Sequence, residues 1–206
     1  MKEETAPPLF CAGVSSYAPI ARYCKPGDEV AVLGIGGLGH LAVQFARAMG
    51  CKVTAFSNSR EKDEFIVKEL RAERVVSSGD LKALDKEKYR FNVVLNTVPA
   101  FDDKLFKAWL SLVKPNGYFV QIGLPAVETP LVIDPMWIVM KQIKLVGSYV
   151  GSRRETKEML EFAAKHGISA KCEIFEFEEF PRAFEKLSKG KPCFRCVVKC
   201  QDYFKK

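Results

Sequence analysis

The stretch that most constrains the fold runs from Glu29 to Ser57, because it has the pattern of a strand, a glycine-rich turn, a helix and a second strand. Residues 30–33 form an apolar run without charge, which is typical of a strand buried on both faces of a parallel sheet. Apolar side chains follow at helical spacing between residues 38 and 49, and Gly50 predicts the end of that helix. The second strand is predicted at residues 51–56, so the stretch predicts one strand-helix-strand unit of a parallel sheet.

The turn carries glycines at the spacing GxGxxG, namely Gly34, Gly36 and Gly39. Glycine has no Cβ atom, which allows a tight turn at Gly34, close approach of a pyrophosphate at Gly36 and close packing of helix on strand at Gly39. The backbone N–H groups where the helix starts, at Gly37 and Leu38, would then face the phosphates. A lone GxGxxG is weak evidence, since such turns also occur for structural reasons. The flanking strands and helix supply the context that favours a dinucleotide site.

The end of the second predicted strand distinguishes between the two nicotinamide dinucleotides. NAD-binding versions carry an Asp or Glu about 20 residues after the first glycine, where it holds the ribose hydroxyls. This chain has no acid at the strand end, and instead has Ser57, Asn58, Ser59, Arg60 and Lys62. Hydroxyls and cations there favour a phosphate on the ribose, so the predicted cofactor is NADP. The alternative is an ordinary helix N-cap with a solvated charge.

Composition argues against several other classes of protein. With 206 residues, 48% of them hydrophobic, the chain is long enough for one full domain with an appendage. We expect no membrane segment, because the chain starts without a signal-peptide pattern and no apolar run approaches the ~18 residues of a membrane span. The seven cysteines are scattered and odd in number, which favours a reducing, cytoplasmic location. The net charge of +7 is spread along the chain, so no nucleic-acid partner is predicted.

Beyond residue 60 helices and strands alternate, which predicts a doubly wound parallel sheet of the α/β class. The predicted helices are 61–70, 80–87 and 102–113, and the predicted strands are 74–77, 91–97, 118–122 and 143–149, with a turn at 114–117 and an N-terminal lead segment over 1–28 that begins polar. Ligands of such sheets bind beyond the carboxyl ends of the strands. The residues expected to line the rest of the dinucleotide site are Thr97, Val98, Ile122, Gly123, Leu124, Ser148, Tyr149 and Val150, although each could equally belong to an ordinary loop.

The chain is predicted to divide at residue 150, into a dinucleotide-binding domain over 1–150 and a C-terminal segment over 151–206. The predicted elements of this tail are a helix at 155–165, a strand at 172–177, a helix at 180–187 and a strand at 194–200. Near its end, Cys193, Cys196 and Cys200 include the CxxC spacing of half a metal site. On a strand Cys193 would point away from the other two, so the preferred interpretation is three small buried hydrophobic residues.

Four stretches resemble the medium-chain zinc-dependent alcohol dehydrogenases, and within them the cinnamyl alcohol dehydrogenase branch. They are APPLFCAGVSSY at 6–17, KPGDEVAVLGIGGLGHLAVQFARAMG at 25–50, the segment Ser57-Asn58-Ser59, and GSYVGSRRETKEMLEFAAKHGI at 147–168. The resemblance covers nearly the whole chain and implies an NADP-binding Rossmann fold. It also implies an aldehyde or alcohol substrate, and a homodimer formed through the edge strand 143–149.

The resemblance further assigns roles to individual residues. It implies that Cys11 corresponds to the third ligand of the catalytic zinc, that Ser15 keeps a hydroxyl near the nicotinamide, and that Arg195 lies on the phosphate side of the cofactor. Ser57, Ser59 and Lys62 match the family's NADP-selecting positions, in agreement with the charge pattern at that strand end.

The resemblance also exposes what this chain lacks. Family members carry, ahead of the segment where this chain starts, a catalytic domain with a Cys and a His ligand and a structural zinc lobe with four cysteines. A catalytic zinc needs three protein ligands, and the histidines are only His40, in the glycine turn, and His166, in the tail. Cys11 is therefore expected to be an orphan ligand, and the apolar face of the tail to be uncovered. His40 has two open interpretations: a hydrogen bond to the pyrophosphate, or a packing or surface role.

These patterns lead to one expected function and two alternatives. The chain is expected to be the cofactor-binding portion of an NADP(H)-dependent alcohol dehydrogenase or aldehyde reductase of cinnamyl type, in which hydride passes from the nicotinamide to an aldehyde carbon while zinc polarises the carbonyl. On its own it is expected to be inactive. The alternatives are a truncated paralogue that binds NADPH and a partner without turnover, and a fragment of a longer protein.

Overall fold

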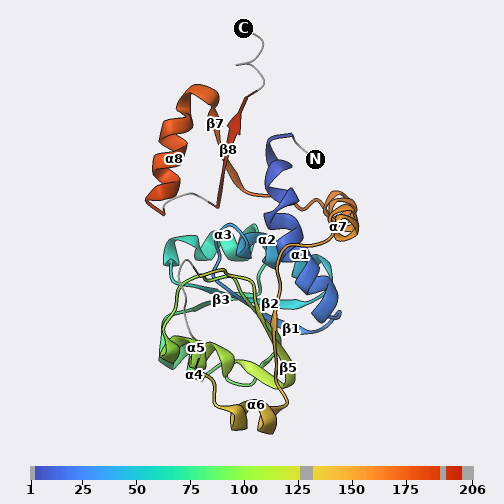
Figure 1. The fold of residues 1–206 in the computed structure, drawn as a ribbon, viewed down its shortest axis with the longest axis vertical. Helices are drawn as coiled ribbons and strands as arrows, with labels where there is room; N and C mark the ends of the chain where they lie inside the picture. Colours follow the sequence, from blue (N-terminus) through green and yellow to red (C-terminus); the bar gives the residue numbers. More distant parts are fainter. Residues whose placement is uncertain (1–2, 126–131, 191–193, 201–206) are drawn as a thin grey trace.

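The computed structural model describes residues 3–125, 132–190 and 194–200. Its main body is a parallel sheet of six strands in the order β3-β2-β1-β4-β5-β6 (Figure 1). These strands are β1 (Glu29–Leu33), β2 (Lys52–Ser57), β3 (Arg74–Ser77), β4 (Phe91–Asn96), β5 (Val113–Gln121) and β6 (Lys144–Gly147). The helices around it are α1 (Ala12–Tyr23), α2 (Gly39–Ala48), α3 (Asp63–Lys68), α4 (Leu81–Asp85), α5 (Asp103–Leu110), α6 (Pro135–Lys141) and α7 (Arg153–His166). This arrangement confirms the predicted doubly wound α/β fold.

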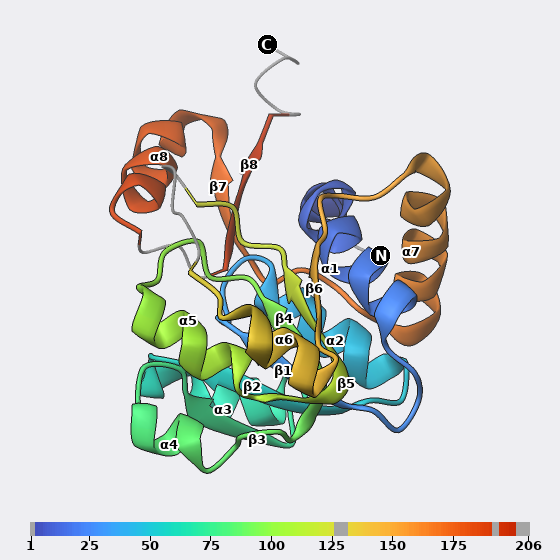
Figure 2. The ribbon, with the colours of Figure 1, turned by 60° about the horizontal axis from the view of Figure 1, so that its bottom comes forward.

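The side chains of β1 explain why helices cover both faces of the sheet. Val30 and Val32 pack in the apolar cluster that contains side chains of α1, α2, α3 and α7, whereas Ala31 and Leu33 pack in the cluster that contains side chains of α4 and α5. All four side chains are fully buried. Successive residues of a strand point to opposite faces, so a strand that is apolar at every position needs cover on both sides. Figure 1 shows α1, α2 and α3 on one side of the sheet and α4 and α5 on the other, and in Figure 2 the α4 and α5 side is turned toward the viewer.

The order of the strands places the candidate site. β1 pairs with β2 on one side and with β4 on the other, and the chain crosses from one half of the sheet to the other between β3 and β4. The strand order reverses at this point. In open parallel sheets the crevice beyond the carboxyl ends of such strands is where ligands bind. The glycine turn after β1 lies at that crevice.

The main differences from the sequence predictions are two helices that they missed and the boundary between α5 and β5. The sequence analysis misses α1. Its residues 12–20 are all buried, so the segment has no polar face that would mark it as an amphipathic helix. The sequence pattern also misses α6, where the side chain of Asp134 caps the first turn by accepting a hydrogen bond from Met136 N (2.9 Å). The turn predicted at 114–117 is wrong, because these residues lie within β5. There the pairing with β4 shifts register, and Asn116 has φ +65°.

The tail has two parts with different contacts. Helix α7 packs against α1, with Met159 and Ala163 buried in the core on that face of the main sheet. Beyond it, β7 (Cys172–Glu176) and β8 (Arg195–Lys199) form a separate parallel pair, with α8 (Phe180–Ser188) beside it (Figure 1). All of these elements occur within two residues of their predicted ends. Within the described ranges, no helix has the length and apolar character needed to cross a membrane.

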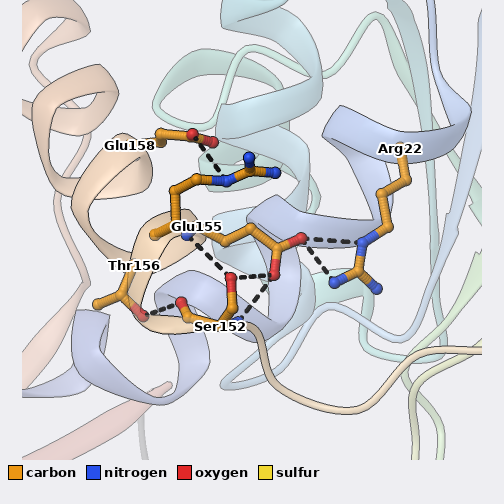
Figure 3. Close-up of polar contacts among 6 residues, drawn as sticks. Arg22, Ser152, Glu155, Thr156 and Glu158 are labelled. Carbon is orange, nitrogen blue, oxygen red and sulfur yellow. Dashed lines mark hydrogen bonds and ion pairs between the residues drawn. The ribbon is translucent and has the colours of Figure 1, made fainter.

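Polar groups fix the start of α7 against the end of α1 (Figure 3). Ser152 Oγ accepts a hydrogen bond from Glu155 N (3.2 Å), and Glu155 Oε2 accepts one from Ser152 N (2.7 Å), which together form a capping box. Arg22 of α1 donates to Glu155 Oε1 through Nε (2.9 Å) and Nη2 (2.6 Å). The backbone N–H of Ser152, with help from its hydroxyl and from Arg22, holds the pKa of the Glu155 carboxyl below its ordinary value.

We predict that Ser152→Ala lowers the free energy of unfolding by about 1 kcal/mol, because one N-terminal N–H of α7 loses its acceptor. Chemical denaturation measures this change. The matched control is Arg154→Ala, since the ion pair of Arg154 with Glu158 spans 3.4 Å and the arginine side chain is 84% exposed. Such exposed pairs contribute about 0–1 kcal/mol, so the control is expected to change stability less. Equal losses in the two variants would contradict the role of the cap.

Candidate cofactor site

The glycine turn is built where β1 ends. Gly34 has φ +83°, a left-handed conformation that suits glycine, and its N–H donates to the carbonyl oxygen of Phe56 at 2.9 Å. The hydroxyl of Thr97, just after β4, donates to the carbonyl oxygens of Leu33 and Gly34 at 2.9 and 2.8 Å. The turn is therefore held by groups from both strands that flank β1.

The other glycines of the motif differ in what surrounds them. A Cβ atom on Gly39 would lie 1.9 Å from the carbonyl oxygen of Gly34, so only glycine allows α2 to start this close to β1. A Cβ atom on Gly36 would have no atom within 4 Å. The N–H groups of Gly37 and Leu38 have no hydrogen-bond acceptor within the described part of the chain. Open space and unpaired N–H groups at a helix start fit a phosphate group.

His40 is part of the support of this turn. Its ring is fully buried, with Nδ1 2.9 Å from the carbonyl oxygen of Gly36 and Nε2 3.1 Å from Lys171 N. A carbonyl oxygen accepts and a backbone N–H donates, so the ring is neutral with its proton on Nδ1. Burial lowers the pKa of His40 to about 4. Both ring nitrogens have protein partners, which decides the open question for His40 in favour of a packing role.

The carboxyl ends of β4 and β5 are joined by side-chain amides that the sequence analysis missed. Asn96 Nδ2 donates to Gln121 Oε1 (2.8 Å), and Asn96 Oδ1 accepts from Val98 N (3.0 Å). Gln121 Nε2 donates to the carbonyl oxygen of Gly123 (2.6 Å). A Cβ atom on Gly123 would lie 2.4 Å from the carbonyl oxygen of Val98. An amide as the last residue of an apolar strand is the signal that could have identified this network.

Ser148, after β6, has a buried hydroxyl without a partner among the described residues. Its N–H donates to the carbonyl oxygen of Gln121 (2.9 Å), but within the described residues its Oγ has no hydrogen-bond partner. Buried hydroxyls are almost always bonded, so this oxygen fits a ligand with a polar group.

The other residues expected at these strand ends differ in exposure. Thr97, Val98, Ile122 and Val150 are half-buried, whereas Leu124 and Tyr149 are 72% and 82% exposed.

The end of β2 has the polar groups that the sequence predicts. Ser57 Oγ accepts from Ser59 N (3.2 Å), and Asn58 Oδ1 accepts from the hydroxyl of Ser78 (2.8 Å). Arg60 is exposed, whereas Lys62 is half-buried with its Nζ 5.2 Å from the ring centroid of Phe194. In the structure Lys62 packs against another side chain of the protein, whereas Arg60 extends into solvent.

Arg195 of β8 brings the tail to the glycine turn. Its Nε donates to the carbonyl oxygen of Gly37 at 3.0 Å, and a Cβ atom on Gly37 would lie 2.7 Å from its guanidinium. Burial lowers the pKa of Arg195 from its ordinary value, but arginine stays charged in proteins. A guanidinium is therefore held beside the glycine turn at Gly37.

A zinc ion fits the described residues poorly. Cys11 is exposed at the start of α1, and Ser15, one turn later, is buried and donates its N–H to the carbonyl oxygen of Cys11 (3.0 Å). In the described ranges no group of three or more His, Cys, Asp or Glu side chains is placed to bind a metal ion. His40 is fully bonded, and the ring of His166 stacks on Phe162 at 4.2 Å. Of the tail cysteines, Cys193 lies outside the described residues, Cys196 is half-buried and Cys200 is exposed, so the expectation of a buried residue is wrong for Cys200.

Comparison with known proteins decides the family. The family model of the zinc-binding dehydrogenases matches residues 37–165, which contain the end of the glycine turn at Gly39 and strands β2 to β6 of the sheet. This chain belongs to the zinc-binding dehydrogenase family. A probable formaldehyde dehydrogenase of Bacillus subtilis is 38% identical over 199 residues, which are 96% of this chain and 56% of that protein.

Solved structures of zinc-binding dehydrogenases agree in fold. A cinnamyl alcohol dehydrogenase of Sorghum bicolor is 33% identical with a TM-score of 0.88, over 96% of this chain and 56% of that chain. A second one, from Helicobacter pylori and complexed with NADP(H), is 30% identical with a TM-score of 0.83, over 97% and 56%. The family resemblance is confirmed, and the chain spans about half the length of the relatives it matches.

We predict that alanine affects stability at one glycine of the turn and cofactor binding at another. Gly39→Ala should destabilise the fold by about 3 kcal/mol or more, because the methyl group meets backbone oxygen that cannot move freely. Gly36→Ala should leave the melting temperature unchanged and weaken dinucleotide binding at least tenfold, because its methyl group enters the open space. Thermal melts and titration calorimetry separate the two effects. A Gly36→Ala variant with unchanged affinity for both dinucleotides would contradict the placement of the phosphates.

Proposed function

We propose that this chain is the NADP(H)-binding portion of a dehydrogenase of cinnamyl type, which transfers hydride between NADPH and an aldehyde or primary alcohol. The observation that carries the proposal is the glycine turn at the reversal of the strand order, with open space at Gly36 and with N–H groups of Gly37 and Leu38 that have no acceptor among the described residues. Relatives named as cinnamyl alcohol dehydrogenases, one of them complexed with NADP(H), support it. The scattered cysteines support a reducing, cytoplasmic setting.

The proposal gives each part of the site a task. Gly37 and Leu38 N–H would donate to the pyrophosphate, and the Arg195 guanidinium beside them would offset its charge. The Oγ of Ser148, which has no partner in the described part of the chain, would bond to the polar group on the nicotinamide side. When bound, the cofactor supplies the hydride chemistry. The chain's own residues bind and orient it.

The preference for NADP(H) rests on the end of β2. No carboxylate follows that strand where an NAD-binding site needs one, and the hydroxyls of Ser57 and Ser59 stand there with the ammonium of Lys62. A 2′-phosphate is stabilised by such donors, whereas a carboxylate would repel it. Arg60 is also close in sequence but exposed, so its contribution should be smaller.

We predict that the 206-residue chain binds NADPH at least tenfold more tightly than NADH, because charge-assisted hydrogen bonds to the 2′-phosphate are among the strong ones. Ser57→Asp should reverse or abolish this preference. Titration calorimetry with both cofactors measures it, and Ser78→Ala, which changes a nearby hydroxyl that bonds Asn58, is the control. Equal affinity of the unaltered chain for the two cofactors would overturn the NADP assignment.

The domain division proposed for this chain follows the same reasoning. Residues 1–150 would form the dinucleotide-binding domain, and residues 151–206 would belong to the catalytic domain of the complete enzyme.

A second candidate function is an NADPH-binding module without turnover. It is favoured by the absence of a metal-ligand group within the described residues.

We predict that the chain alone does not oxidise NADPH with cinnamaldehyde, even with added zinc. One exposed thiolate at Cys11 does not make a three-ligand zinc site, and without a polarising group the oxyanion that develops on the aldehyde is not stabilised. The assay is NADPH absorbance, with metal content measured on the same preparation. Stoichiometric zinc together with turnover that Cys11→Ala abolishes would show that this chain holds a complete site.

We also propose a homodimer through β6, the edge of the main sheet. An edge strand offers unpaired backbone groups, and the neighbouring α6 exposes Met136, Val139 and Met140 by 70%, 72% and 74%. Lys144 of β6 donates to the carbonyl oxygen of Asn116 (2.8 Å) and so lies along its own sheet. Sedimentation at micromolar concentration should give a dimer that Gly147→Pro dissociates, because Ser148 N donates to β5, the N–H of Gly147 therefore points to the free edge, and a Cβ atom on Gly147 would have no atom within 4 Å. A monomer under these conditions would refute the proposal.

A further inference from the structure

Phe194 joins the tail to the end of β2 through its ring. The side chain is only 7% exposed, and its ring centroid lies 4.9 Å from that of His40 and 5.2 Å from that of Phe65. The Nζ of Lys62 lies 5.2 Å from the same centroid. An ammonium at this distance over an aromatic face is attracted by the negative charge of the π-system. Phe194 is thus packed between the support of the glycine turn and a cation of the candidate site.

Lys62 differs from the other lysines nearby in the partner it has. Lys68 pairs with Glu64, and Lys171, which lies over the ring of Phe65, pairs with Glu69. Within the described ranges Lys62 has no acidic partner, although it is half-buried. The ring of Phe194 is therefore what holds an unneutralised ammonium at the end of β2. An ammonium in that state is ready to bind an anion.

The backbone of Phe194 places two functional groups at once. Phe194 has φ +69°, a left-handed conformation that is uncommon for a residue with a large side chain. The next residue, Arg195, donates from Nε to the carbonyl oxygen of Gly37 (3.0 Å). One dipeptide of the tail thus supplies a platform for Lys62 and a guanidinium for the glycine turn.

We propose that Phe194 is a positioning residue that holds the Lys62 ammonium for the 2′-phosphate of NADP(H), and so contributes to discrimination against NADH. The proposal rests on the proposed NADP(H) binding and deepens it. A free lysine side chain samples many rotamers, and ordering it opposes binding. A lysine already held on a ring loses less freedom when the phosphate arrives, which is the general advantage of preorganisation. NADH has no phosphate at that position and gains nothing from the ring.

The test measures the dissociation constants of NADPH and NADH for the 206-residue chain and its variants. Phe194→Leu keeps an apolar side chain but removes the π-face, and should lower the ratio of NADPH to NADH affinity about three- to tenfold with NADH affinity unchanged. Phe194→Tyr keeps the ring and should leave the ratio of NADPH to NADH affinity as it is in the unaltered chain. A merely structural loss would weaken both cofactors together, so the ratio separates positioning from folding.

The double variant Phe194→Leu with Lys62→Gln decides whether the ring acts through the lysine. Once Lys62 is gone, removing the ring should change the ratio no further. Phe65→Leu is the matched control and should leave the ratio unchanged, since the ring of Phe65 also packs against that of Phe194 but carries Lys171 rather than Lys62 over its face. A lowered ratio in Lys62→Gln with an unaltered ratio in Phe194→Leu would overturn this inference and leave the proposed function standing. No preference for NADPH in the unaltered chain would overturn both.

Discussion

The close approach of Gly39 to the carbonyl oxygen of Gly34 is the contact on which the rest of the site depends. It fixes where α2 begins relative to β1, and so it fixes the direction in which the N–H groups at the start of α2 point. Thr97 donates to the carbonyl oxygens at this contact from the neighbouring strand, which ties β4 to the same geometry. A residue with a Cβ atom at either glycine would move the helix, the turn or both.

Polar groups around this contact follow one rule with one exception. His40, Asn96 and Gln121 are buried or half-buried, and each has its hydrogen-bond partners inside the protein. Such satisfied networks make a turn rigid, because breaking any member leaves a buried group unpaired. Ser148 is the exception, since its hydroxyl has no partner within the described part of the chain. A rigid set of hydrogen-bonded groups with one unsatisfied hydroxyl is typical of a ligand site that is already formed without its ligand.

The sequence predicted the fold well where local patterns match tertiary demands. The strand, glycine turn and helix over residues 29–57 follow from an apolar run and from glycine spacing, which are local signals. Helix α1 could not be recognised in this way, because Gly13, Ser15 and Pro19 are poor helix formers and its residues 12–20 are buried with no polar face. The register shift in β5 depends on its pairing with β4, and no pattern within residues 113–121 records that.

The candidate site shows the same limit more sharply. The charge pattern at the end of β2 predicted Lys62 and Arg60 alike, and only the family resemblance favoured Lys62. In the structure, contact with Phe194, 132 residues later, distinguishes Lys62. Arg195 contacts Gly37 and Lys171 contacts His40 across similar distances in sequence. Without these contacts a ring nitrogen of His40 and the carbonyl oxygen of Gly37 would need other partners. The tail is therefore part of the support of the glycine turn, and the apolar core that Phe194, Ile168 and Ala170 share with α2 is the reason it stays there.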